Sequence, residues 1–115
     1  MASVAYLVRD LFFVSKIRET AAQLGVDVER AADAEALGLA AREARLVIVD
    51  LRLPEAEEAL ARVVADPASA GARTVGFVDH ENVAAMEAAR ARGCGTVLSK
   101  RKFSSELPAL LTACR

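Results

Sequence analysis

Short, unbroken apolar runs separated by helix-like stretches most constrain the fold of this chain. Two such runs lie at residues 4–8 and 46–49, and two further strand-like segments, each opened by a threonine, lie at 74–78 and 96–98. Runs without polar alternation are typical of strands buried on both faces, as strands of a parallel sheet are. A fifth segment, 26–29, alternates apolar and polar residues as an edge strand does. The sequence therefore predicts five strands, the second of them at an edge.

Helices are predicted between and after these strands. In the first, at 12–24, the three- and four-residue spacing of Phe13, Ile17, Ala21 and Leu24 predicts one buried stripe, and Gly25 is a natural stop. The others are predicted at 33–44 capped by Asp33, at 55–65 opened by Pro54, at 82–92 ended by Gly93, and in a last helix capped by Ser104 or Ser105 with Pro108 in its first turn.

A strand–helix unit repeated five times predicts an α/β fold with right-handed crossovers. The alternating second strand agrees with the flavodoxin-like (βα)5 three-layer sandwich, whose five-stranded parallel sheet has the order 2-1-3-4-5. The 115 residues are 54% hydrophobic, which is enough for one core. We therefore expect a single domain over residues 1–115.

Charge and the N-terminal sequence argue against two classes of partner. The formal net charge is −1, whereas nucleic-acid binders usually carry a basic excess. The first apolar stretch stops at Arg9-Asp10, too soon for a signal-peptide core or a membrane span. We therefore expect a cytoplasmic protein that contacts neither nucleic acid nor membrane.

Charged residues follow four of the five predicted strands. Because parallel strands end at one edge of their sheet, we expect these charges to meet in one crevice. Such a group would either bind a divalent metal or neutralise itself. The residues concerned are Arg9, Asp10, Asp50, Asp79, His80 and Lys100.

The chain resembles the receiver domain of bacterial response regulators over nearly its whole length. The segment 46–54, LVIVDLRLP, looks like the family's phosphoacceptor strand, and 70–79, 88–95 and 96–100 fall where its later elements belong. The resemblance implies that Asp50 is the phosphoacceptor, that Lys100 contacts the phosphoryl group, and that Mg²⁺ is held by Asp10, Asp50 and the backbone carbonyl of Arg52.

Three positions depart from the family's pattern. Arg9 stands where the first acidic metal ligand belongs, Asp79 where a switch Ser or Thr belongs, and Arg101 where a cis proline is usual. A cation at a metal-ligand position and an anion facing the phosphoryl oxygens both oppose phosphorylation. We expect a divergent, pseudo-receiver site closed by its own charges, with Arg9 bridging Asp50 or Asp79 and Lys100 paired with another carboxylate.

We therefore predict a degenerate receiver-like module of a two-component or phosphorelay pathway that acts by phosphorylation-independent protein–protein interaction, with a signalling protein or a second copy as partner. No cofactor is expected. One alternative is a working phosphoacceptor at Asp50 with an atypical Mg²⁺ site. Another is a flavodoxin-like binder of a small ligand or nucleotide.

Enzyme activity is not expected, because Walker A, GxGxxG and Ser/His/Asp patterns are absent from the sequence and Arg52 replaces the second carboxylate of aspartate phosphatases. His80 is interpreted as a solvated turn residue. Leu11 and Phe12 flank the crevice, where they either form a cover or partner patch or fold over neighbouring side chains.

Overall fold

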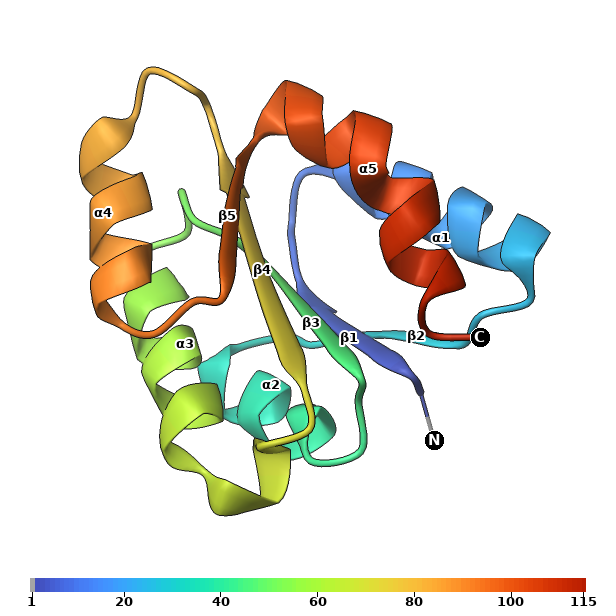
Figure 1. Ribbon diagram of the computed structural model, residues 1–115, viewed down its shortest axis with the longest axis horizontal. Helices are drawn as coiled ribbons and strands as arrows, with labels where there is room; N and C mark the ends of the chain where they lie inside the picture. The colour runs from blue at the N-terminus through green and yellow to red at the C-terminus, as the bar shows by residue number, and fades with distance from the viewer. Residues whose placement is uncertain (1) are drawn as a thin grey trace.

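The computed structural model describes residues 2–115, and Figure 1 labels their helices and strands. A single 3₁₀ turn at Pro67–Ser69 follows the third helix. The elements in chain order are β1 (Val4–Leu7), α1 (Leu11–Leu24), β2 (Val28–Arg30), α2 (Ala34–Ala41), β3 (Leu46–Asp50), α3 (Ala56–Ala65), β4 (Arg73–Val78), α4 (Val83–Ala91), β5 (Thr96–Ser99) and α5 (Lys100–Thr112).

The five strands form one parallel sheet in the order β2-β1-β3-β4-β5, which confirms the predicted topology. The central strands β1 and β3 are buried along their whole length, whereas β2 is half-buried to exposed at its edge. The runs in β1, β3 and β4 therefore correspond to central positions and the alternating segment to an edge, whereas the run at 96–98 forms β5, which is half-buried at the other edge.

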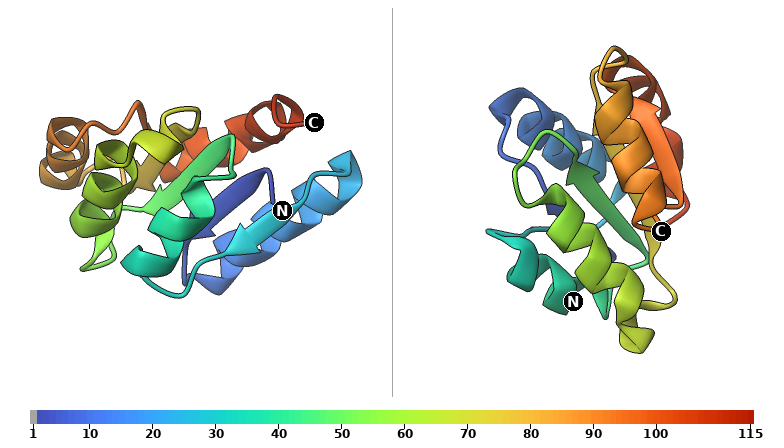
Figure 2. Two further views of the ribbon diagram at one scale, coloured as in Figure 1. Left: turned by 90° about the horizontal axis from the view of Figure 1, so that it is seen from below. Right: turned by 90° about the vertical axis from the view of Figure 1, so that its left-hand side faces the viewer.

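Helices cover both faces of the sheet, with α1 and α5 on one side and α2, α3 and α4 on the other (Figures 1 and 2). Successive residues of each strand point to opposite faces of the sheet, so they contribute to two separate hydrophobic cores. The core under α1 and α5 contains an aromatic group in which Phe77 and Phe103 stack with ring centroids 4.3 Å apart and Phe13 lies against both rings. This group fixes both helices against the carboxyl-terminal half of the sheet.

Most helix ends use the local chemistry that the sequence indicated. Asp33 caps α2 by accepting from Ala36 N, and Asn82 caps α4 by accepting from Ala85 N. Gly25 and Gly93 have positive φ angles of 70° and 91°, which glycine adopts without steric cost. Among the helices of residues 2–115, none has both the length and the apolar character needed to cross a bilayer.

The prediction for the last helix was wrong. Helix α5 begins at Lys100, directly after β5, because the Ser99 hydroxyl accepts from Lys102 N at 3.1 Å and caps it there. Pro108 consequently lies inside the helix rather than in its first turn. An interior proline costs about 3 kcal/mol, but burying four apolar side chains contributes about 1.5–3 kcal/mol each. These side chains are Phe103, Leu107, Leu110 and Leu111.

We expect Pro108→Ala to stabilise the protein by about 2 kcal/mol. Alanine at this exposed position supplies a backbone N–H that can donate to the Ser104 carbonyl, a helical hydrogen bond that proline cannot form. Alanine also increases the conformational entropy of the unfolded chain, which lowers stability, but by less than the hydrogen bond raises it. Urea unfolding measures the change. Pro108→Gly restores the same N–H and should gain about 1 kcal/mol less. An unchanged or lower stability for Pro108→Ala would contradict an unbroken helix through residue 108.

Candidate functional site

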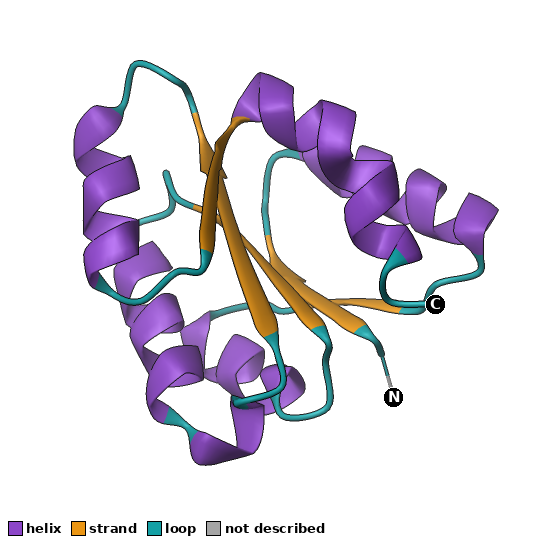
Figure 3. Cartoon of the chain, in the orientation of Figure 1, coloured by secondary structure: helices purple, strands orange, loops and turns teal. Residues whose placement is uncertain are grey.

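The carboxyl ends of the strands open into a cleft of about 740 Å³. Its lining residues come from the carboxyl ends of β1, β3 and β4 and the loops that follow them. These loops are teal in Figure 3. Four of the predicted site residues line this cleft: Arg9, Asp10, Asp50 and Arg52. Asp79 and His80 instead line a neighbouring hollow with Glu81 and Asn82. The expected single crevice is therefore two adjoining depressions that share Asn82.

Asp50 is the last residue of β3 and lies at the floor of the cleft, with only 2% of its surface exposed. Its Oδ1 accepts one hydrogen bond, from Arg52 N at 3.0 Å. Among residues 2–115, no cation lies within 4.0 Å of this carboxylate, and its Oδ2 has no hydrogen-bond partner. Asp50 is thus a buried acid whose second oxygen is unpaired.

The neighbouring Leu51 holds the end of β3 in place. Its backbone N–H donates to the Phe77 carbonyl at 3.0 Å, which continues the pairing of β3 with β4 by one residue. Its side chain fills the space beside Gly76, where a Cβ would meet Leu51 Cδ2 at 2.7 Å. Glycine at position 76 therefore allows Leu51 to pack over β4 next to Asp50.

Asp10 serves as the N-cap of α1. Its Oδ1 accepts from Phe12 N at 2.9 Å, so one carboxylate oxygen satisfies the first turn of the helix. The residue also lines the cleft with Asp50. Asp10 is therefore both a helix cap and a lining residue of the cleft.

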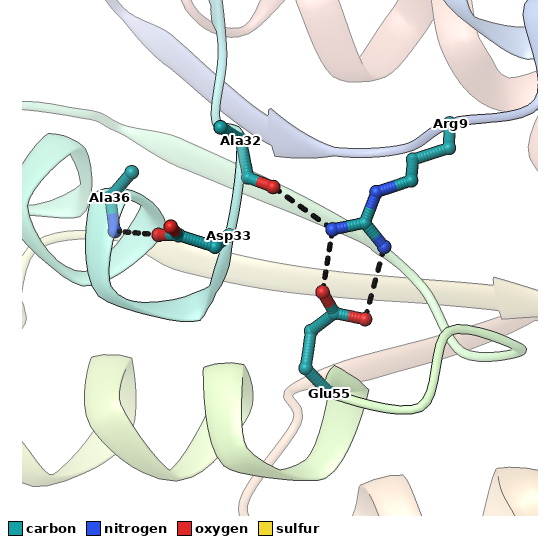
Figure 4. Close-up of polar contacts among 5 residues, drawn as sticks. All are labelled: Arg9, Ala32, Asp33, Ala36 and Glu55. Atoms are coloured by element: carbon teal, nitrogen blue, oxygen red, sulfur yellow. Dashed lines mark hydrogen bonds and ion pairs between the residues drawn. The ribbon is translucent and has the colours of Figure 1, made fainter.

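Arg9 does not bridge Asp50 or Asp79, and this prediction was wrong. Its guanidinium instead forms two hydrogen bonds to the Glu55 carboxylate, at 3.0 and 2.5 Å, and donates to the Ala32 carbonyl at 2.9 Å (Figure 4). A forked pair with one carboxylate suits the planar guanidinium better than a single contact does. One side chain thus joins the loops that follow β1, β2 and β3.

Glu55 is the site residue that the sequence analysis missed. It is the N-cap of α3 but makes no side-chain capping bond, because Arg9 takes its carboxylate. The hydrogen bond from Arg9 lowers the pKa of Glu55 to about 2. Its position after Pro54, at the sheet edge that carries Arg9, was the available signal. An acid at a helix start is common enough to conceal it.

Lys100 faces Asp79 across the ends of β4 and β5, with Nζ 3.3 Å from Oδ1. This geometry agrees with the expected pairing of Lys100 with a carboxylate. Its side chain is 24% exposed, and Nζ lies 5.9 Å from the centroid of the Phe13 ring. The lysine is therefore held by an anion on one side and an aromatic face on the other.

The remaining predicted residues lie at the surface. The His80 side chain is 80% exposed, as a solvated turn residue should be. Arg101 is exposed, and residues 2–115 contain no cis peptide bond. Leu11 and Phe12 are 74% and 65% exposed, although the Phe12 ring also packs edge-on against Phe13. An apolar surface therefore flanks the cleft beside Asp10.

The cleft offers a magnesium ion few side-chain ligands. Among residues 2–115, Asp10 and Asp50 are the only carboxylates that line it, and each has one oxygen that accepts a backbone N–H. Mg²⁺ prefers six oxygen ligands in octahedral geometry, so water or backbone carbonyls would have to complete its coordination here. Within the described part of the chain, no three His, Cys, Asp or Glu side chains form a group able to hold a metal.

We expect Arg9→Gln to raise the pKa of Glu55 from about 2 toward its ordinary value of 4.5. Because folding lowers this pKa, the ion pair stabilises the protein fully above the ordinary value and loses its contribution as the pH falls toward 2. The difference in unfolding free energy between wild type and Arg9→Gln should shrink over that interval. Carbon NMR of the Glu55 carboxyl group and urea unfolding at several pH values measure both effects.

The Arg42–Asp66 pair, at 2.7 Å, offers a matched control. Arg42→Gln should raise the pKa of Asp66, which hydrogen bonding to Arg42 lowers, and leave the pKa of Glu55 at about 2. A Glu55 carboxyl that still titrates near 2 in Arg9→Gln would contradict the pairing in Figure 4.

Comparisons with known proteins identify the fold. No protein-family model and no curated protein sequence matches the chain. Among solved structures, a response regulator from Hahella chejuensis shares 18% identity over 99% of this chain and 95% of its own, with a TM-score of 0.79. The receiver domain of NtrX from Brucella abortus shares 19% identity over 96% of each chain, with a TM-score of 0.74.

A third similar structure carries a metal. It is the receiver domain of a sensor histidine kinase from Pseudomonas aeruginosa, crystallised with a magnesium ion coordinated in its active site cleft. It shares 18% identity over 97% of this chain and 95% of its own, with a TM-score of 0.79. The chain therefore has the five-stranded α/β fold of response-regulator receiver domains.

Proposed function

We propose that this chain is a degenerate, non-enzymatic receiver domain that signals by binding a protein partner without phosphorylation of Asp50. The observation that carries the proposal is the distribution of charge at the strand ends. Arg9 is bound to Glu55 and Lys100 to Asp79, so neither cation reaches Asp50. The proposal retains the cytoplasmic location expected from the sequence.

Phosphoryl transfer requires positive charge around the transferred group rather than covalent help from the protein. A receiver with Asp50 as phosphoacceptor would need a metal and Lys100 on the phosphoryl oxygens. Among residues 2–115, two carboxylates line the cleft for a metal, and Lys100 is paired with Asp79. Asp79 would also bring negative charge toward the phosphoryl group. These features support a site that does not accept phosphate.

The same contacts support a single fixed conformation. Arg9 connects the β1–α1, β2–α2 and β3–α3 loops, and the Asp79–Lys100 pair connects the β4–α4 loop to α5. Moving any of these loops would break a charge-assisted hydrogen bond or an ion pair. A binding surface that stays in one conformation recognises a partner without a phosphorylation signal.

The working phosphoacceptor remains the second candidate because of one observation. Asp50 is buried at the floor of an open cleft with a free Oδ2, the arrangement that an attacking carboxylate would need. Both functions are compatible with a buried carboxylate at position 50. The charges at residues 9 and 79 distinguish a phosphoacceptor from a phosphorylation-independent receiver, and the following experiment changes those charges.

The test is labelling with acetyl phosphate in the presence of Mg²⁺, read by intact mass. Wild type should gain no phosphoryl group. The double variant Arg9→Asp/Asp79→Thr restores the acid and the hydroxyl that the receiver resemblance implies, and it should gain one. Adding Asp50→Asn to that variant should abolish the label.

Labelling of the wild-type chain at Asp50 would overturn the proposal and favour the phosphoacceptor. A double variant that folds but stays unlabelled would show that residues 9 and 79 are not what prevents phosphorylation. Circular dichroism of each variant establishes that the fold is retained.

A further inference from the structure

We infer that the cleft over Asp50 binds an arginine side chain presented by the partner protein. This inference deepens the proposed function and rests on it, because it names the chemistry by which a partner would be recognised. The arginine would use the cleft lined by Asp10 and Asp50. It would pair with the Asp50 carboxylate, which residues 2–115 leave without a cation.

The unpaired carboxylate of Asp50 is the first argument. The residue is 2% exposed, and one backbone N–H is its only hydrogen-bond donor among residues 2–115. Its Oδ2 is not among the fully enclosed side-chain atoms that lack a partner, so it is open to the cleft, where a cation could form a charge-assisted hydrogen bond with it. Because the cleft opens onto Asp50, a side chain from another molecule can reach it.

The second argument is that the neighbouring cations are occupied elsewhere. Arg9 lines the cleft, but its guanidinium is bound to Glu55 and to the Ala32 carbonyl. Lys100 is bound to Asp79. Arg52 directs its backbone N–H at Asp50, while its exposed side chain makes none of the ion pairs found in residues 2–115. The Arg9–Glu55 and Lys100–Asp79 pairs are each close to neutral. Asp10 and Asp50 are therefore the negative charges of the cleft that can attract a cation from another molecule.

The shape and lining of the cleft favour arginine. A guanidinium presents several N–H donors in one plane and can serve two carboxylates at once, whereas an ammonium acts as a point charge. The Oδ1 atoms of Asp10 and Asp50 accept backbone N–H groups, which leaves the Oδ2 atoms for a ligand. The cleft volume of about 740 Å³ accommodates a guanidinium with its aliphatic stem.

Apolar side chains beside the carboxylates provide contact for that stem and for flanking residues of the partner. Leu53 lines the cleft, and the exposed Leu11 and Phe12 follow Asp10 directly. Long cationic side chains bury their methylene groups on such surfaces while the head group reaches a charge. The surface therefore fits a partner segment in which an arginine is flanked by apolar residues.

The experiment titrates the wild-type chain with N-acetyl-arginine amide and follows backbone amide shifts by ¹⁵N NMR. N-acetyl-citrulline amide, which has nearly the same shape without the charge, is the matched probe. We expect saturable shifts at Leu51 and Arg52 with the arginine probe, with a millimolar Kd, and none with citrulline. Asp50→Asn should raise that Kd about tenfold or more, while Asp27→Asn, an exposed acid between α1 and β2, should leave it unchanged.

Equal shifts with citrulline, no saturable shifts, or an unchanged Kd in Asp50→Asn would overturn the inference. An N-acetyl-lysine amide that binds as tightly as arginine would overturn the assignment to a guanidinium. The arginine–citrulline comparison on the wild-type chain decides the matter even if Asp50→Asn fails to fold. Failure here is distinguishable from failure of the proposed function, because acetyl phosphate labelling reports only on phosphorylation.

Discussion

Parallel pairing of β1, β3, β4 and β5 is the constraint on which the rest of the structure depends. Because every strand runs in the same direction, every strand ends at the same edge, and the polar residues that follow the apolar runs meet there. Charged side chains within the buried strands would be desolvated, so the charges lie after the strands rather than within them. The chemistry of the site therefore follows from the arrangement of the sheet, and the pairing of the charges decides what the site can do.

Charge pairing at this edge is selective. Arg9 binds Glu55 through two nitrogens, and Lys100 binds Asp79, so four charged side chains form two pairs that exclude Asp50. The result differs from a site in which every charge neutralises its neighbour. Loops are joined to one another, while one buried carboxylate keeps a free oxygen toward the cleft. These joined loops and the free oxygen of Asp50 are the basis of the proposed recognition of a cation.

Most of the fold could be predicted from the sequence, because buried runs, helix caps and glycine stops act through local physics. Ser99 and Pro108 were the exception. The packing of Phe103 and its neighbours in α5 outweighs the cost of an interior proline, and this comparison requires tertiary contacts. At the site, the sequence placed Asp10, Asp50 and Arg52 beside one cleft. It could not identify Glu55 as the partner of Arg9, because the residues are 46 positions apart and several acids were available.

The central claim is that these two ion pairs hold the strand-end loops in one conformation that phosphoryl groups do not change. The most direct measurement is a titration of the wild-type chain with Mg²⁺ and beryllofluoride, followed through the amide NMR spectrum. The account predicts that resonances of Asp10, Asp50, Asp79 and Lys100 stay in place at all concentrations. Saturable shifts at these residues that disappear in Asp50→Ala would contradict it and identify the chain as a working phosphorylation switch.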